Sequence, residues 1–78
     1  MTSDIIEREQ AALFQTYRRL PLVIERAEGV RITTQDGSVY LDFLGGIAVN
    51  ALGHSHPRLV QAVVDQVHRY MHVSNFFY

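Results

Sequence analysis

The sequence predicts an α+β fold with an N-terminal helix, a β-hairpin within a short antiparallel sheet, a loop and an amphipathic helix. Three observations support this class: helical spacing of apolar residues before Pro21, an Asp36-Gly37 turn between alternating segments, and a valine-rich stripe of helical spacing after Pro57. The chain has 78 residues, of which 47% are hydrophobic, so the sequence predicts one small unit and not two domains.

The first helix is expected to begin at Asp4 and to end before Pro21. Aspartate is a favoured N-cap residue, and Glu7 follows three positions later, as in a capping box. Proline ends the helix because it disfavours helical backbone at the preceding residue and has no amide hydrogen to donate. Residues 22–24 are a short apolar run, which fits a brief strand or an extended arm. The apolar face of the helix is expected to contain Ile6, Leu13, Tyr17 and Leu20.

The dipeptide Asp36-Gly37 is the strongest local signal in the sequence. Both central positions of a type I′ turn require positive φ, and Asp-Gly is one of the sequences that favour this two-residue turn. The resulting register places apolar residues on one face of the hairpin and pairs opposite charges on the other. The predicted facing pairs are Thr34 with Val39, Ile32 with Leu41, Val30 with Phe43, Arg31 with Asp42, and Thr33 with Tyr40.

After the hairpin, Gly45 and Gly46 end the strand and permit backbone conformations that other residues avoid. Residues 47–52 are mostly apolar and are expected to form a buried loop or a short turn. Pro57 suits the first position of a helix, where its missing amide hydrogen has no helical partner. The apolar stripe of this second helix is expected to contain Val60, Val63, Val64, Val67, Tyr70 and Met71.

Composition excludes several classes of function. Seven basic residues against eight carboxylates give a formal charge of −1, which argues against a nucleic-acid binder. The chain has no cysteine for a disulfide, its first residues do not read as a signal peptide, and it has no apolar run of about 18 residues for a membrane span. A cytoplasmic protein is therefore expected. The chain contains no lysine, since all seven of its Lys and Arg residues are arginine. These 78 residues alone therefore cannot supply a Schiff-base lysine.

Four histidines within residues 54–72 raise the question of a metal site. His68 and His72 have the i,i+4 spacing that lets two imidazoles share one ion on a helix. His54 and His56 precede that helix, about 18 Å away at a rise of about 1.5 Å per residue, so the two pairs cannot form one site. Hydrogen-bonded or exposed histidines are the simpler interpretation, and no metal ligand is assigned.

Residues 40–57, with the sequence YLDFLGGIAVNALGHSHP, resemble the class III aminotransferases, which depend on pyridoxal 5′-phosphate (PLP). Residues 21–26, the Asp36-Gly37 turn and residues 72–75 fit the same pattern, which extends from about Tyr17 onward. The similarity is greatest to the acetylornithine branch. It implies that residues 1–78 are the N-terminal segment of the small domain of a longer fold type I PLP enzyme. The large domain, with its phosphate-binding loop, an aspartate for the pyridinium nitrogen and the Schiff-base lysine, would lie outside this segment.

The same resemblance implies roles for six positions. Tyr17 matches an aromatic residue at the mouth of the substrate site, although the packing of its ring on the first helix is an equally good interpretation. Ile47 matches a substrate-pocket position at which ornithine aminotransferases carry tyrosine, so its aliphatic side chain favours an N-acylated or neutral-chain substrate. No catalytic residue is assigned. Contact with the cofactor or the dimer interface is expected for Gly45, Gly46, Ser74 and Asn75.

The implied function is a homodimeric PLP-dependent aminotransferase that transfers the δ-amino group of N-acetylornithine to 2-oxoglutarate in arginine biosynthesis. This segment would shape the substrate pocket and the dimer interface, and would be inactive alone. Ornithine, succinylornithine, succinyldiaminopimelate and 4-aminobutyrate remain open as amino donors. Two other classes also remain open: a free-standing α+β interaction module that dimerises through its C-terminal aromatic residues, and a small histidine-based metal-binding protein.

Overall fold

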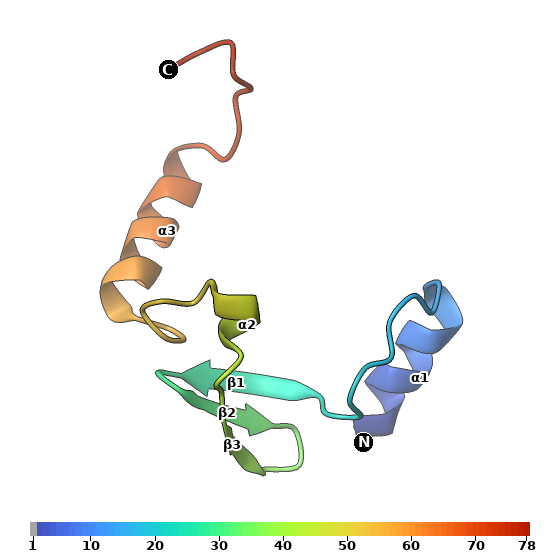
Figure 1. Cartoon of the computed structure of the whole chain (residues 1–78). Coiled ribbons are helices and arrows are strands. Elements are labelled where there is room, and N and C mark those ends of the chain that lie inside the picture. Colours follow the sequence, from blue (N-terminus) through green and yellow to red (C-terminus); the bar gives the residue numbers. More distant parts are fainter. Residues whose placement is uncertain (1) are drawn as a thin grey trace.

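The computed structural model describes residues 2–78 and has the predicted α+β class (Figure 1). Its three strands form one antiparallel sheet in the order β1-β2-β3, with a helix before the sheet and two after it. The elements are α1 (Thr2–Ala12), β1 (Ile24–Glu28), β2 (Arg31–Thr34), β3 (Val39–Leu41), α2 (Gly45–Ala48) and α3 (Pro57–Arg69).

Helix α1 is shorter than predicted and ends at Ala12, well before Pro21. The side-chain amide of Gln15 donates a hydrogen bond of 3.0 Å to the carbonyl of Leu13, one of the carbonyls that has no helical partner at this end. Asp4 lies in the first turn of the helix and is not its N-cap, because the helix begins at Thr2. The predicted apolar face is therefore wrong, since three of its members lie beyond the helix: Leu13, Tyr17 and Leu20.

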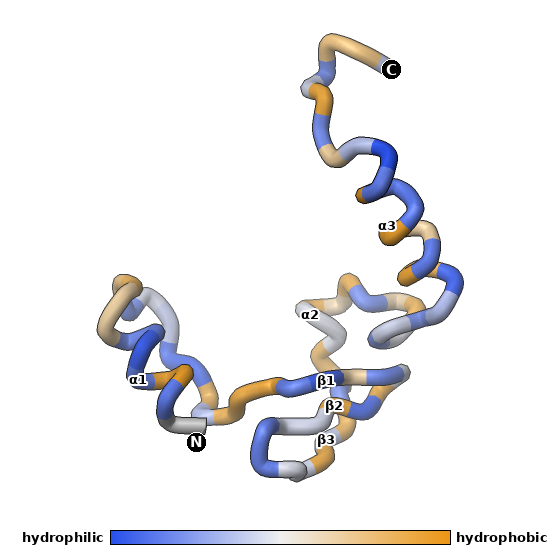
Figure 2. The backbone as a smooth tube through the Cα atoms, turned by 180° about the vertical axis from the view of Figure 1, so that it is seen from behind, coloured by the Kyte–Doolittle hydropathy of each residue, from blue (hydrophilic) through white to orange (hydrophobic). Residues whose placement is uncertain are grey.

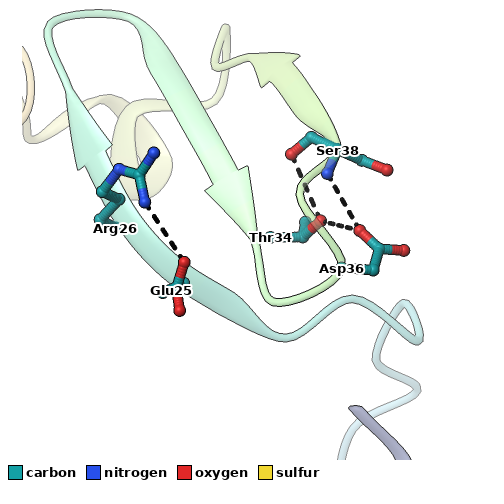
Figure 3. Close-up of polar contacts among 5 residues, drawn as sticks. All are labelled: Glu25, Arg26, Thr34, Asp36 and Ser38. Atoms are coloured by element: carbon teal, nitrogen blue, oxygen red, sulfur yellow. Dashed lines mark hydrogen bonds and ion pairs between the residues drawn. The ribbon is translucent and has the colours of Figure 1, made fainter. Parts of the chain in front are cut away.

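The hairpin turn has three residues, 35–37, and not the predicted two. The amide of Gly37 donates to the carbonyl of Thr34 (3.0 Å), and the amide of Thr34 donates to the carbonyl of Ser38 (2.9 Å). Only Gly37 has positive φ here, at 89°, as expected for a type I turn followed by one left-handed residue. Asp36 completes the turn, because its Oδ1 accepts hydrogen bonds from the amide of Ser38 and the hydroxyl of Thr34 (Figure 3).

The longer turn shifts the register between β2 and β3 by one residue, so the predicted facing pairs are wrong. A shift of one residue moves every side chain of a strand to the other face of the sheet relative to its partner. Arg31 consequently faces Leu41 and not Asp42, and the charge pair expected between them does not form. The remaining observed pairs are Ile32 with Tyr40 and Thr33 with Val39.

Strand β1 begins at Ile24, so only the last residue of the apolar run at residues 22–24 belongs to the strand, and the other two precede it. In the β1–β2 connection, Gly29 forms an isolated antiparallel bridge with His54, with hydrogen bonds of 2.8 and 2.9 Å between their backbones. The hydroxyl of Ser55 also donates to the carbonyl of Ala27, at 2.8 Å. These bonds hold the segment that follows α2 against the edge of the sheet, and α3 leads away from that point (Figure 1).

Helix α3 begins at Pro57, as predicted, and its N-cap is His56, whose Nδ1 accepts a hydrogen bond of 3.2 Å from the amide of Arg58. Hydrophobic positions recur along this helix, in agreement with the predicted stripe (Figure 2). The helix ends at Arg69, so two of the predicted members, Tyr70 and Met71, follow it. No helix among residues 2–78 is both long and apolar enough to cross a membrane.

Within residues 2–78 the three strands pack only on one another, and neither α1 nor α3 packs on the sheet. Where burial is described, no hydrophobic side chain is buried, and Thr34 is the one buried residue. The radius of gyration is 16.2 Å, whereas a compact chain of this length is expected to have about 11.5 Å. The segment is therefore open (Figure 1). The hydrophobic residues along α3, orange in Figure 2, are exposed.

Candidate functional site

Helix α2 is a left-handed turn. Its four residues have positive φ: 61° at Gly45, 64° at Gly46, 69° at Ile47 and 60° at Ala48. The turn is closed by a hydrogen bond of 2.8 Å from the amide of Ala48 to the carbonyl of Leu44. Left-handed backbone costs an L-residue roughly 1–2 kcal/mol, and positive φ is a marked outlier for a β-branched side chain such as isoleucine. Such strain concentrates at functional sites, so this turn is the leading candidate in the chain.

The turn presents its apolar side chain outward. Ile47 is 78% exposed, and Val49 and Leu52 are exposed as well. The prediction of a buried loop at residues 47–52 is therefore wrong, while the prediction of a short turn is confirmed. An aliphatic side chain held on strained backbone and open to solvent is available to contact a bound molecule or another part of a protein.

Asp42 holds the start of this turn. Its Oδ1 accepts hydrogen bonds from the amides of Leu44 and Gly45, each 2.9 Å long. Its Oδ2 lies 2.6 Å from Nε2 of His54, and the Asp42 side chain is only 9% exposed. The amide of Gly45 and the His54 side chain, in that order, lower the pKa of Asp42 below its ordinary value, with a smaller contribution from the amide of Leu44. The carboxylate therefore stays charged further into acid than an unperturbed aspartate.

Sequence reasoning missed the Asp42–His54 pair, because the two residues are separated by an irregular segment and Asp42 was paired with Arg31. A local signal was nevertheless present. Aspartate side chains often accept hydrogen bonds from backbone amides two or three residues later, and Leu44 and Gly45 stand at those positions. The partner of the second carboxylate oxygen had no such local signal.

The strain at α2 predicts that one substitution will stabilise the protein. Changing Ala48 to glycine removes the left-handed penalty, which the larger conformational entropy of glycine only partly offsets, so a gain of about 0.5–1 kcal/mol is expected. Thermal unfolding is the measurement. Ala62→Gly, within the right-handed helix α3, is the control and should destabilise by about 1 kcal/mol. A loss of stability in Ala48→Gly would contradict the strain.

Tyr17 lies in the segment between α1 and β1 and is 74% exposed, so its ring does not pack within a helical stripe. The guanidinium of Arg19 lies over this ring, 5.6 Å from its centroid, and also pairs with Glu9 of α1 at 3.1 Å. An open cavity of about 440 Å³ lies between α1 and this segment, and Tyr17 is part of its lining. No residue of α2 lines this cavity.

Ser74 and Asn75 lie in the C-terminal segment, which both views place far from α2 (Figures 1 and 2). Ser74 has a φ of 69°, and its amide donates a hydrogen bond of 3.1 Å to Nδ1 of His72. The structure thus brings three of the six candidate residues together, at α2, and leaves the other three on two separate segments. The three at α2 are Gly45, Gly46 and Ile47.

The histidines form no metal centre in the part of the chain that the structure describes, where no group of three or more His, Asp or Glu side chains could hold an ion. His54 is instead bonded to Asp42, and His56 caps α3. His72 accepts the hydrogen bond from the Ser74 amide, so three of the four histidines have hydrogen bonds within the chain.

Comparison with known proteins identifies the family. The model of the aminotransferase class-III family matches residues 13–78. Acetylornithine aminotransferase of Agrobacterium fabrum is 52% identical over 67 residues, which are 86% of this chain and 17% of that protein. The corresponding enzyme of Streptomyces coelicolor is 54% identical over 76 residues, 95% of this chain and 18% of that protein.

Solved structures agree with the family model. Acetylornithine aminotransferase from Elizabethkingia anophelis matches 99% of this chain with a TM-score of 0.90 and 36% identity, and the match covers 20% of that chain. This chain thus spans about a fifth of the length of the relatives that it matches. Its likeness to them includes the α2 segment and the motif around it. The chain belongs to the class-III aminotransferase family.

Proposed function

We propose that this chain is the N-terminal segment of the small domain of a PLP-dependent enzyme that transfers the δ-amino group of N-acetylornithine to 2-oxoglutarate, a step of arginine biosynthesis. The observation that carries the proposal is the identity of 52% to an acetylornithine aminotransferase across 86% of the chain. Relatives of the same name from several bacteria match at 43–54% identity. The whole enzyme is proposed to be a cytoplasmic homodimer.

The open structure supports the placement of this segment within a longer protein. Where burial is described it has no buried hydrophobic side chain, and the apolar stripe of α3 has no partner among residues 2–78. A large domain and a second subunit would cover these surfaces.

The residues of this segment fit the wall of a PLP site but not the attachment of the cofactor. Gly45 leaves its backbone open to a close approach, whereas at Gly46 the side chains of Val49 and Asn50 fill the space that a Cβ would take. No lysine is present to form the Schiff base. PLP supplies the electron sink for amino transfer when it is bound. The lysine, the phosphate-binding loop and the aspartate for the pyridinium nitrogen would come from the large domain, and this segment would shape the space around the substrate.

Ile47 is proposed to contact the amino donor. Its exposed aliphatic side chain projects from a strained turn, so its position is held by backbone geometry and not by packing. An aliphatic contact favours the uncharged acyl end of N-acetylornithine over the second ammonium group of ornithine, because a charged group loses hydration against an apolar surface. Ornithine is the second candidate donor, since an ornithine aminotransferase from Toxoplasma gondii matches this backbone with a TM-score of 0.90 at 29% identity.

Steady-state kinetics of the whole enzyme with a panel of amino donors test the proposal. The value of kcat/KM is expected to be highest for N-acetylornithine, ahead of ornithine, succinylornithine and 4-aminobutyrate. Changing Ile47 to tyrosine should shift the ratio of kcat/KM for N-acetylornithine and ornithine about tenfold or more toward ornithine. A wild-type enzyme that prefers ornithine or 4-aminobutyrate would contradict the proposed substrate but not the family.

A further inference from the structure

We propose that Asp42 and His54 act together as positioning residues that hold the left-handed turn of α2 in the shape that presents Ile47 to the amino donor. This inference rests on the proposed function for its substrate, and on the geometry of the turn for the rest. Neither side chain is proposed to touch the substrate.

The carboxylate of Asp42 uses both of its oxygens at the start of the turn. One oxygen accepts from the amides of Leu44 and Gly45, the two residues that lead into the left-handed backbone. The other accepts from Nε2–H of His54, since an ionised carboxylate can only accept. Hydrogen bonds to a charged group are among the strongest that a side chain offers.

His54 is itself fixed to the sheet. Its backbone exchanges two hydrogen bonds with Gly29 at the β1–β2 connection, and the adjacent Ser55 donates to Ala27 of β1. The Asp42 side chain therefore joins the start of the segment 42–54 to its end, and the end is anchored on the sheet. The strained turn lies between these two points.

The strain in the turn makes the Asp42–His54 pair necessary. Ile47 and Ala48 both occupy left-handed backbone that L-residues disfavour, and α2 packs on no other helix or strand among residues 2–78. The bonds that hold the turn in place are thus those of its own backbone and those of Asp42. If the pair is broken, we expect the backbone to relax and Ile47 to lose its fixed position.

The test uses the whole PLP-loaded enzyme and the variant Asp42→Asn, which keeps the shape of the side chain and removes its charge. KM for the amino donor is expected to rise about tenfold, with kcat changed less than about threefold, because a contact remote from the reacting atoms contributes equally to substrate and transition-state binding. Amide hydrogen exchange in residues 43–50 should become about tenfold faster.

Asp36 offers a matched control, because it makes the same kind of bonds in the hairpin turn: its Oδ1 accepts from the amide of Ser38 and the hydroxyl of Thr34. Asp36→Asn should leave KM and the exchange of residues 43–50 unchanged. A second substitution, Ala48→Gly, relieves the strain and should reverse part of the rise in KM when it is combined with Asp42→Asn. If Asp42→Asn fails to fold, His54→Gln is expected to show the same rise in KM and exchange.

The inference is overturned if Asp42→Asn, or His54→Gln in its place, leaves both KM and exchange unchanged, or if Asp36→Asn produces the same changes. Failure of the proposed function has a different signature. In that case the wild-type enzyme does not use N-acetylornithine, while faster amide exchange of residues 43–50 in Asp42→Asn still supports the positioning role of Asp42 and His54.

Discussion

Replacing Gly53 with alanine is expected to destabilise the protein by about 2–4 kcal/mol, from left-handed strain and steric conflict together. Gly53 has a φ of 76°, and a Cβ at this position would lie 3.0 Å from the carbonyl oxygen of Gly29 and 3.1 Å from its Cα. These are backbone atoms, and Gly29 is held by its two hydrogen bonds with His54, so it cannot move aside as a flexible side chain would. The measurement is thermal unfolding of the whole enzyme.

Gly37→Ala is the control for Gly53→Ala. Gly37 has a φ of 89°, but apart from its own atoms and those of its two chain neighbours no heavy atom lies within 4 Å of the Cβ that alanine would add. This variant therefore carries the left-handed strain without the clash and should lose only about 1–2 kcal/mol. Equal losses at the two positions would show that the contact between Gly53 and Gly29 has no energetic importance.

Introducing a carboxylate on the apolar stripe of α3 has the second large expected effect. Val67 is 50% exposed in this segment, but a large domain is proposed to cover the stripe in the whole enzyme. Val67→Glu should then destabilise the whole enzyme by about 3 kcal/mol or more, because an unpaired charge would be buried. Thermal unfolding of the whole enzyme is the measurement.

Gln61→Glu supplies the control for Val67→Glu, because it adds the same side chain to the polar side of the same helix. Its expected loss is below about 0.5 kcal/mol, from repulsion by Asp65 one turn later. If Val67→Glu is as mild as Gln61→Glu in the whole enzyme, the stripe stays in water there and the proposed placement of the segment is wrong.

Local sequence signals predicted which helices and strands form better than they predicted the strand register and the helix ends. The α+β class, the hairpin and the start of α3 at Pro57 followed from periodicity, an Asp-Gly turn and a helix-starting proline, and the structure confirms them. The register failed because Asp-Gly suits both a two-residue turn and the observed three-residue turn. The end of α1 failed because Pro21 sets only an outer limit for a helix that stops earlier, at Ala12.

The candidate site depended on features that are not local. The resemblance directed attention to Ile47, but neither periodicity nor composition predicts four successive residues with left-handed backbone, two of which carry side chains. The Asp42–His54 pair was also beyond sequence reasoning, since it depends on the return of the chain to Gly29 at the sheet edge. What Tyr17, Ser74 and Asn75 contact in a completed site depends on parts of the protein outside residues 2–78, so their roles stay predictions.

The central claim is that the lysine that binds PLP lies outside this segment. Borohydride reduction of PLP-treated protein tests it, because mass mapping then locates the labelled peptide. The whole enzyme is expected to retain PLP through dialysis and to carry the reduced label on a lysine outside residues 1–78. Residues 1–78 alone contain no lysine, so they should carry no label on a lysine side chain, and any label should be confined to the N-terminal amine. A whole protein that transfers amino groups without retaining PLP, or an isolated segment that forms glutamate by itself, would contradict the proposal.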